Sequence, residues 1–110
     1  MFEVTSVGDA SLIRVESDID ILSAPALEAA IRLAEAANPP RIVVSLERCH
    51  YCDSTGLAVF VRSHNRLGHR FALVVKPEQQ MRKIFAITGL LDVFAVCATL
   101  DGALALPLAS

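Results

Sequence analysis

Short apolar runs alternate with polar breaks along this chain, and several of the breaks are followed by apolar residues at helical spacing. Runs rich in branched residues predict strands, and the runs at 42–46 and 71–75 are apolar enough to be covered on both faces. A Gly-Asp turn at 8–9 predicts that the first two strands form a hairpin. The expected strands cover residues 2–7, 12–15, 42–46, 71–75 and 93–96.

A first helix is expected after Ser23, which is a candidate N-cap, with Pro25 in the first turn and the Asn-Pro-Pro sequence at 38–40 as the stop. The periodicity divides it into an inward face with Leu27, Ala30, Ile31 and Ala34 and an outward side with Glu28, Arg32 and Glu35.

A second helical pattern runs from Gly56 to Gly68. Its expected inward face has Leu57, Phe60, Val61, His64 and Leu67, and its expected outer side has Ala58, Val59, Arg62 and Arg66. Pro77 is expected to open a third helix that ends at Gly89, and the alanine- and leucine-rich residues 99–106 predict one or two further helical turns.

This order of elements predicts an α/β, α+β-like fold: a mixed sheet of four to five strands with about four helices packed on it. A helix between two strands implies a crossover, so the strand at 42–46 is expected to run parallel to an earlier one. The length of 110 residues predicts a single domain that spans residues 1–110.

Composition narrows the class of protein. Hydrophobic residues make up 54% of the chain and charged residues 20%, which predicts a folded core rather than disorder. The net charge of −2 argues against a nucleic-acid-binding protein, and no apolar run is long enough to insert into a membrane. Because the N-terminal residues lack a secretion signal and the cysteine count of three is odd, we expect a cytoplasmic protein.

Basic residues nevertheless gather on the second helix and just beyond it. They are Arg62, His64, Arg66, His69 and Arg70. Two interpretations are open: an ordinary solvated helix face, or a patch for an acidic partner.

Candidate chemistry concentrates in the sequence Tyr-Cys-Asp-Ser-Thr-Gly-Leu at 51–57, called the corner segment below, where a strand pattern ends and the second helix begins. Asp53 or Ser54 can cap the free N–H groups of the first turn. The same N–H groups and the helix dipole favour an anion, so a phosphate on Ser54 or Thr55 would be tolerated there. Taken alone, the segment fits a simple N-cap as well as a modification site.

Other chemistries find less support. A redox module at Cys-His-Tyr-Cys, 49–52, would need a lowered thiol pKa, which Asp53 opposes, so buried structural cysteines are expected instead. A zinc site lacks a second pair of ligands, and a serine hydrolase would need glycine where Cys52 precedes Ser54. We therefore expect no enzymatic activity, no cofactor and no metal.

The corner segment resembles the signature of STAS domains of the anti-sigma-factor antagonist type. The likeness extends from about residue 3 to residue 97, in the same order and spacing as in that family. The other matching stretches are the acidic loop and first helix at 18–27, the strands at 42–46 and 71–75, and the third helix with its Thr-Gly-Leu end at 81–90.

The resemblance implies a switch. In such antagonists a serine protein kinase, itself the anti-sigma factor, binds the corner and phosphorylates the serine after the aspartate, here Ser54, with Thr55 as the second choice. The unphosphorylated antagonist holds the kinase and frees a sigma factor to activate transcription, and a PP2C-type phosphatase resets the phosphorylated form. The resemblance and the helix pattern together predict a partner-binding surface with Asp20, Asp53, Ser54, Thr55, Gly56, Ala58, Val59 and Arg62.

Four positions depart from the family pattern, among them Ser17 and His69, which stand where glycine is common. Cys52 replaces a larger apolar residue, and Ala58 replaces a frequent glycine on the helix that partners contact, which bears on the choice of partner. The same resemblance also allows an alternative function, since other STAS domains serve without phosphorylation as subunits of lipid or ABC transporter complexes or as regulatory modules of anion transporters.

Overall fold

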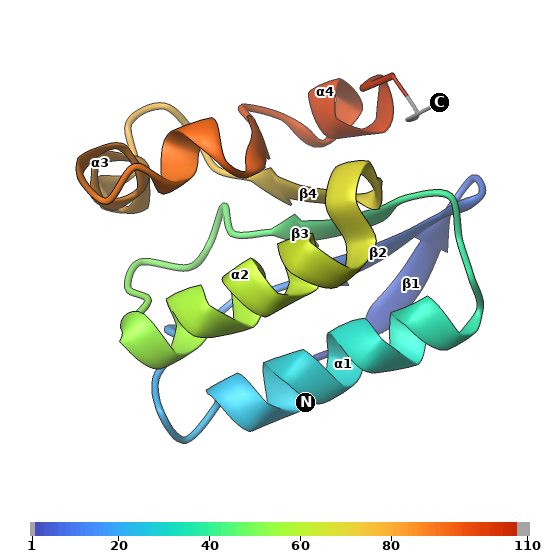
Figure 1. Ribbon diagram of the computed structural model, residues 1–110, viewed down its shortest axis with the longest axis horizontal. Coiled ribbons are helices and arrows are strands. Elements are labelled where there is room, and N and C mark those ends of the chain that lie inside the picture. The colour runs from blue at the N-terminus through green and yellow to red at the C-terminus, as the bar shows by residue number, and fades with distance from the viewer. Residues whose placement is uncertain (1, 108–110) are drawn as a thin grey trace.

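One sheet organises the molecule, and its strands lie side by side in the order of the sequence (Figure 1). The structure is a computed structural model that describes residues 2–107. Its strands are β1 (Val4–Val7), β2 (Ala10–Arg14), β3 (Ile42–Ser45), β4 (Phe71–Val74) and β5 (Ala95–Cys97). Its helices are α1 (Ala24–Ala36), α2 (Ser54–Leu67), α3 (Gln80–Ile87) and α4 (Leu100–Leu104), with 3-10 turns η1 (Gly68–Arg70) and η2 (Leu90–Asp92).

The sheet is mixed, as predicted. β1 pairs antiparallel with β2 through the hairpin at Gly8, whose φ of 63° lies in the left-handed region that glycine adopts freely. The remaining pairs are parallel, and one register row runs through Ile13, Val44, Leu73 and Val96. The predicted central position of the strand at 42–46 is confirmed, because β3 lies between β2 and β4.

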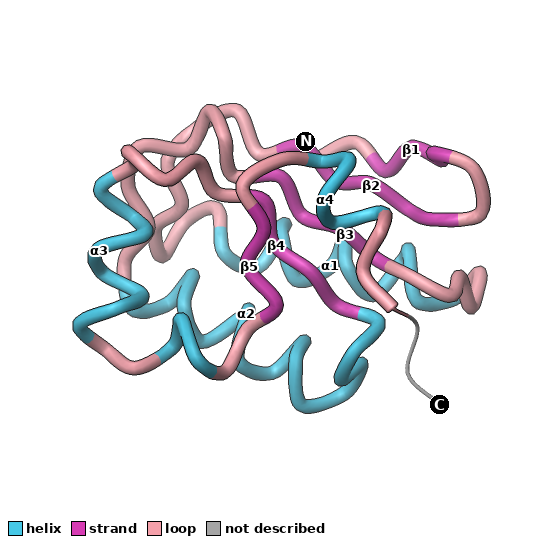
Figure 2. Tube along the Cα trace, turned by 90° about the horizontal axis from the view of Figure 1, so that it is seen from above, coloured by secondary structure: helices cyan, strands magenta, loops and turns pink. Residues whose placement is uncertain are grey.

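Helices cover the two faces of the sheet unequally. Figure 2 shows α1 and α2 below the sheet and α4 alone above it. Alternate residues of each strand therefore enter different cores, since Ile13 and Val44 face α1 and α2 while Leu12 and Val43 face α4. The predicted inward face of the first helix is confirmed, and its four apolar residues are all buried. No helix among residues 2–107 is long and apolar enough to cross a membrane.

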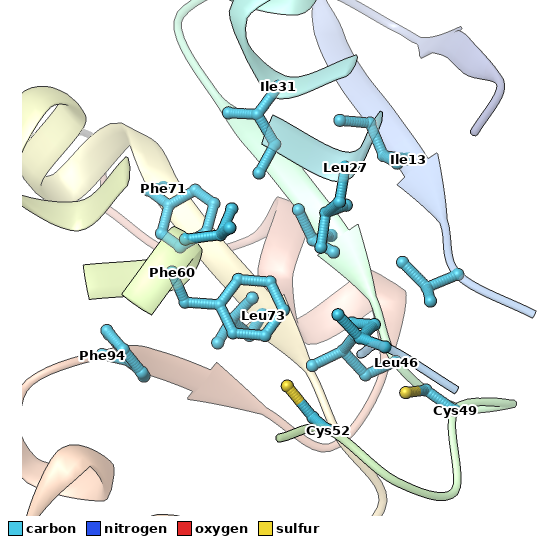
Figure 3. Close-up of a cluster of buried hydrophobic side chains, with 14 of the residues drawn as sticks. Ile13, Leu27, Ile31, Leu46, Cys49, Cys52, Phe60, Phe71, Leu73 and Phe94 are labelled. Atoms are coloured by element: carbon cyan, nitrogen blue, oxygen red, sulfur yellow. The ribbon is translucent and has the colours of Figure 1, made fainter. Parts of the chain in front are cut away.

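Aromatic rings fill the larger core beneath α2 (Figure 3). Phe60 packs against Phe71 and Phe94 at centroid distances of 6.3 and 6.4 Å, and Phe85 lies 5.7 Å from Phe94. Edge-on packing of this kind adds about 1 kcal/mol per pair beyond the area buried. These contacts fix α2 and α3 against the sheet, and with them the start of α2.

On the other face, a buried arginine anchors α4. Arg41 donates hydrogen bonds to the carbonyl oxygens of Ala103 at 2.9 Å and Leu106 at 2.5 Å. Thr99 caps the helix by accepting a hydrogen bond from the N–H of Gly102 at 3.0 Å. The predicted helical turns after residue 99 are thus confirmed, and Arg41 attaches them to the edge of β3.

Most element ends differ from the sequence prediction by one or two residues, and three differences concern how an element begins. Ser23 occupies the N-cap position of α1 but makes no capping bond, because its hydroxyl accepts a hydrogen bond from the N–H of Asp20 at 3.0 Å. Pro77 lies in a turn, and α3 begins only at Gln80. The last strand begins at residue 95 rather than 93, because Val93 and Phe94 form a turn after η2 in which both N–H groups donate to the carbonyl of Leu90.

The late start of α3 has a visible cause. The side-chain amide of Gln79 donates to the carbonyl oxygens of Leu46 at 2.8 Å and Cys49 at 3.1 Å. The same side chain accepts a hydrogen bond from the N–H of Lys76 at 2.7 Å. These hydrogen bonds form with an extended backbone at Gln79, and they hold the loop that leads from β3 to the corner segment.

Candidate functional site

The corner segment turns from loop to helix at Asp53. Asp53 has an extended backbone, and its carboxylate accepts hydrogen bonds from the N–H groups of Thr55 at 2.9 Å and Gly56 at 3.2 Å. The predicted capped helix start is confirmed, and of the two candidate caps it is Asp53 that acts. Ser54 is the first residue of α2 and points to solvent.

The two hydroxyls beside Asp53 differ in their surroundings. The Thr55 hydroxyl donates to the Asp53 carboxylate, whereas the Ser54 hydroxyl has no hydrogen-bond partner within residues 2–107. The Thr55 hydroxyl, together with the N–H groups of Gly56 and Thr55, lowers the pKa of Asp53 against the opposing effect of partial burial. Asp53 is therefore ionised at neutral pH, and Ser54 carries the exposed hydroxyl of the corner segment.

The acidic loop after β2 closes over the corner segment. The N–H of Ile19 donates to the carbonyl of Tyr51 at 2.9 Å, and the N–H of Asp53 donates to the carbonyl of Ile19 at 3.1 Å. Asp20 follows directly, and its carboxylate accepts a hydrogen bond from the N–H of Leu22 at 2.9 Å. This bridge holds the acidic loop against the start of α2.

Gly56 is required for the close approach of that loop. A Cβ at this position would lie 2.4 Å from the sulfur of Cys52 and 2.6 Å from Cγ2 of Ile19, and both of those side chains are buried. Gly56 is itself buried, so it lies beneath the predicted partner-binding surface. The importance of this glycine lies in its lack of a side chain.

A groove of about 480 Å³ runs from the corner segment between α1 and α2, and is called the α1–α2 groove below. The residues that line it include Ile21, Pro25, Thr55, Ala58, Val59 and Arg62. Ala58 is half-buried in its wall. The predicted exposure of Val59 is wrong: its side chain is 1% exposed and belongs to the core, because α1 lies alongside α2 and widens the buried arc of the helix.

Charged residues tie the two helices together along this groove. Glu28 accepts a hydrogen bond from Arg62 at 2.5 Å and lies 3.3 Å from Arg66, and Arg66 donates to Glu35 at 2.8 Å. The predicted outward placement of Glu28 and Glu35 is therefore wrong, because both carboxylates face α2. The hydrogen bond from the Arg62 guanidinium lowers the pKa of Glu28.

Fewer of the basic residues on and after α2 are free to bind an acidic partner than the sequence suggests, because neighbouring groups already engage most of the arginines. Arg62 and Arg66 are engaged by carboxylates, and Arg70 donates to the carbonyl of Pro39 at 2.8 Å. His64 packs against Phe94 with a ring distance of 6.0 Å, as expected for an inward-facing residue. Of these basic residues, Arg62 is the one whose charge borders the α1–α2 groove.

Sequence reasoning missed an exposed apolar pair beside this groove. Ile21 is 69% and Leu22 86% exposed in the turn between the acidic loop and α1. Two consecutive large apolar residues in an otherwise polar loop were the available signal, since exposed apolar patches often mark interaction surfaces. The pair extends the groove's apolar surface towards the corner segment.

The cysteines behave as buried structural residues. Figure 3 shows Cys49 and Cys52 at the edge of the larger core, and burial raises the pKa of Cys49 to about 11 and that of Cys52 to about 12. Within residues 2–107, no three histidine, cysteine or acidic side chains gather closely enough to hold a metal ion. The raised pKa values oppose a reactive thiol pair at these two positions.

We expect these two thiols to resist alkylation at neutral pH, because with a pKa of about 11 roughly one thiol in three thousand is ionised at pH 7.5. Iodoacetamide labelling of Cys97→Ser protein, followed by intact mass, should show no adduct while N-acetylcysteine reacts completely. The rate should rise about tenfold per pH unit, and guanidinium should expose both thiols. A thiol that reacts at the rate of N-acetylcysteine at pH 7.5 would contradict the structural assignment.

We compared the sequence with known proteins and found a matching family and several relatives. The STAS domain family profile matches residues 1–103. The chain is 29% identical over 96 residues to the anti-sigma-F factor antagonist RsfB of Mycobacterium tuberculosis, covering 86% of this chain and 78% of the relative. It is also 29% identical over 86 residues to the anti-sigma-B factor antagonist of Staphylococcus aureus, covering 76% and 80%.

A solved structure shows the same arrangement in three dimensions. The crystal structure of an anti-sigma factor antagonist from Mycobacterium paratuberculosis superposes with a TM-score of 0.84 at 32% identity. The match covers 94% of this chain and 90% of that one. The predicted α/β fold is confirmed by this likeness.

Proposed function

The chain belongs to the STAS domain family, and from that membership we propose that it is an anti-sigma-factor antagonist switched by phosphorylation of Ser54. The relatives named as antagonists cover most of the chain, and the structural match is to another antagonist. In this function the chain acts in the cytoplasm as a binding protein without catalysis of its own. Its partner is a serine-kinase anti-sigma factor, and its binding releases a sigma factor that activates transcription.

The observation that carries the proposal is the contrast between the two hydroxyls of the corner segment. Ser54 is exposed at the first position of α2, while the Thr55 hydroxyl is held by the Asp53 carboxylate. Phosphorylation of Thr55 would break that hydrogen bond and the cap it supports. Ser54 is thus the acceptor, and Thr55 helps to position Asp53.

Phosphate transfer to Ser54 leaves the surrounding structure unchanged. The Ser54 oxygen attacks the γ-phosphorus of ATP held by the kinase, ADP leaves, and the hydroxyl proton passes to a base on the kinase. The phosphate adds about 1.5 to 2 negative charges at pH 7. The positive end of the α2 dipole favours negative charge at this position, so the helix stays intact.

Release of the partner then follows from charge. The phosphate lies beside the ionised Asp53, and Asp20 lies in the loop bridged to the corner segment. A kinase surface that fits the unmodified corner meets concentrated negative charge after phosphorylation, and like charges in contact cost several kcal/mol. A PP2C-type phosphatase hydrolyses the phosphoserine with water and restores binding.

Site-resolved phosphorylation tests the proposal. Each serine-kinase anti-sigma factor of the source genome is purified and incubated with the chain and ATP, and the product is mapped by tandem mass spectrometry. We expect one phosphate on Ser54, none in Ser54→Ala, and an unchanged site in Thr55→Val. Phosphate on Thr55 of the parent chain would overturn Ser54 as the acceptor, and no binding to any of these kinases would overturn the proposal and favour the transporter-subunit alternative.

A further inference from the structure

The loop that carries the corner segment is held from outside by the side chain of Gln79, the residue directly before α3. Its amide nitrogen donates to the carbonyl oxygens of Leu46 at 2.8 Å and Cys49 at 3.1 Å. Leu46 and Cys49 are both buried (Figure 3). Within residues 2–107, Gln79 is the only donor to the Cys49 carbonyl, so loss of this amide leaves that carbonyl unpaired.

Hydrogen bonds connect Gln79 to the cap of α2 in an unbroken series. The Cys49 thiol, next to the carbonyl that Gln79 holds, donates to the carbonyl of Tyr51 at 3.3 Å. The same Tyr51 carbonyl accepts the N–H of Ile19 at 2.9 Å, and the Ile19 carbonyl accepts the N–H of Asp53 at 3.1 Å. Asp53 in turn caps the first turn of α2. The position of the cap therefore depends on contacts that begin at Gln79.

Gln79 is itself fixed in one orientation. A carboxamide group has two N–H donors and one acceptor oxygen, and here both donors are used. The oxygen accepts the N–H of Lys76, just after β4, at 2.7 Å. The side chain thus relates the loop to a strand of the central sheet, which gives the loop a rigid reference.

We propose that Gln79 is a positioning residue for phosphorylation of Ser54: by fixing the loop through Cys49 and Asp53, it presents the Ser54 hydroxyl in one orientation. This inference rests on the proposed function and adds a residue outside the corner segment to its mechanism. Phosphate transfer needs the serine oxygen in line with the γ-phosphorus of ATP. A small misplacement of a reacting group lowers the rate strongly, even when its cause lies at a distance.

Amide hydrogen exchange of the full chain, followed by NMR, tests the positioning without a kinase. Gln79→Met removes both donations at similar side-chain length, and Gln80→Met, at the exposed first position of α3, is the matched control. In Gln79→Met the amides of Ile19 and Asp53 should exchange at least about tenfold faster, beyond any change at Val44 in the central strand. In the control they should stay within about twofold of the parent chain.

Steady-state phosphorylation by the kinase that modifies the parent chain provides the second measurement. For Gln79→Met, kcat should fall at least about tenfold while KM changes less than about threefold, because orientation of the hydroxyl is lost rather than docking. Gln79→Glu keeps the acceptor for the Lys76 N–H and loses both donations at neutral pH, so it should show the same reduction. Gln80→Glu is its charge-matched control and should react like the parent chain.

The outcomes separate this inference from the proposed function. Thermal melting first confirms that each variant is folded. Corner amides that exchange no faster than Val44, or a parent-like kcat in both Gln79 variants, would overturn the positioning role while the Ser54 switch stands. A parent chain that no kinase phosphorylates would overturn the proposed function, whereas the amide exchange, which needs no kinase, decides by itself whether Gln79 fixes the corner segment.

Discussion

Replacing Ser54 with glutamate is expected to weaken binding of the kinase partner roughly tenfold to a hundredfold, whereas Ser54→Ala should bind as tightly as the parent chain. The glutamate puts a permanent negative charge beside Asp53, at the first position of α2. Because negative charge at a helix N-terminus is favourable, the variant should remain folded. The mimic carries less charge than a phosphate, so the true phosphorylated form should bind still more weakly.

Calorimetric titration of the kinase against the two Ser54 variants measures this effect. Asn65→Glu provides the control, because it adds the same charge at an exposed position of α2 that is far from the corner segment. It should change the affinity less than about twofold. Equal affinities for Ser54→Ala and Ser54→Glu would mean that charge at the corner segment does not control binding.

Gly56→Ala should destabilise the protein by about 1–3 kcal/mol, although alanine favours a helix by about 1 kcal/mol over glycine. The added methyl group would overlap the Cys52 sulfur and Cγ2 of Ile19, so one of these buried side chains must move. Movement there separates the acidic loop from the start of α2. Affinity for the kinase should fall as well, beyond the loss of folded protein.

Denaturant unfolding of the single and double variants tests whether overlap with the Cys52 side chain causes the loss of stability in Gly56→Ala. Cys52→Ala removes the nearer clashing atom, so Gly56→Ala should cost at least about 1 kcal/mol less in that background than in the parent chain. Ile19 remains close, so the recovery should be partial. Additive losses would show that the missing side chain at Gly56 is unrelated to the contact with Cys52.

Local patterns predicted the elements that depend on their own residues. The strands followed from short branched runs, and the start of α2 from an aspartate before two hydroxyl residues, because a cap is made within four residues of chain. The order of these elements then predicted one mixed sheet, and the resemblance to antagonists agreed with it. The local patterns and the family resemblance both indicated the corner segment as the candidate site.

The errors came from contacts between segments far apart in sequence. Val59 and Glu28 were placed outward because a single helix shows only one buried stripe, whereas α1 and α2 lie side by side and share a second one. Gln79 delayed the start of α3 because its side chain binds carbonyls more than 25 residues earlier. Neither effect has a signature within the helix concerned.

The sequential order of the strands has a consequence for how the chain folds during synthesis. Each strand after β1 pairs with the strand made just before it, so the sheet can grow from one edge as the ribosome delivers it. The Ile19–Cys52 bridge is available once α2 has emerged, well before α4. The Arg41 side chain stays solvated until residues 103 and 106 have been synthesised and their carbonyls can accept its hydrogen bonds. Docking of α4 is therefore the last step of folding.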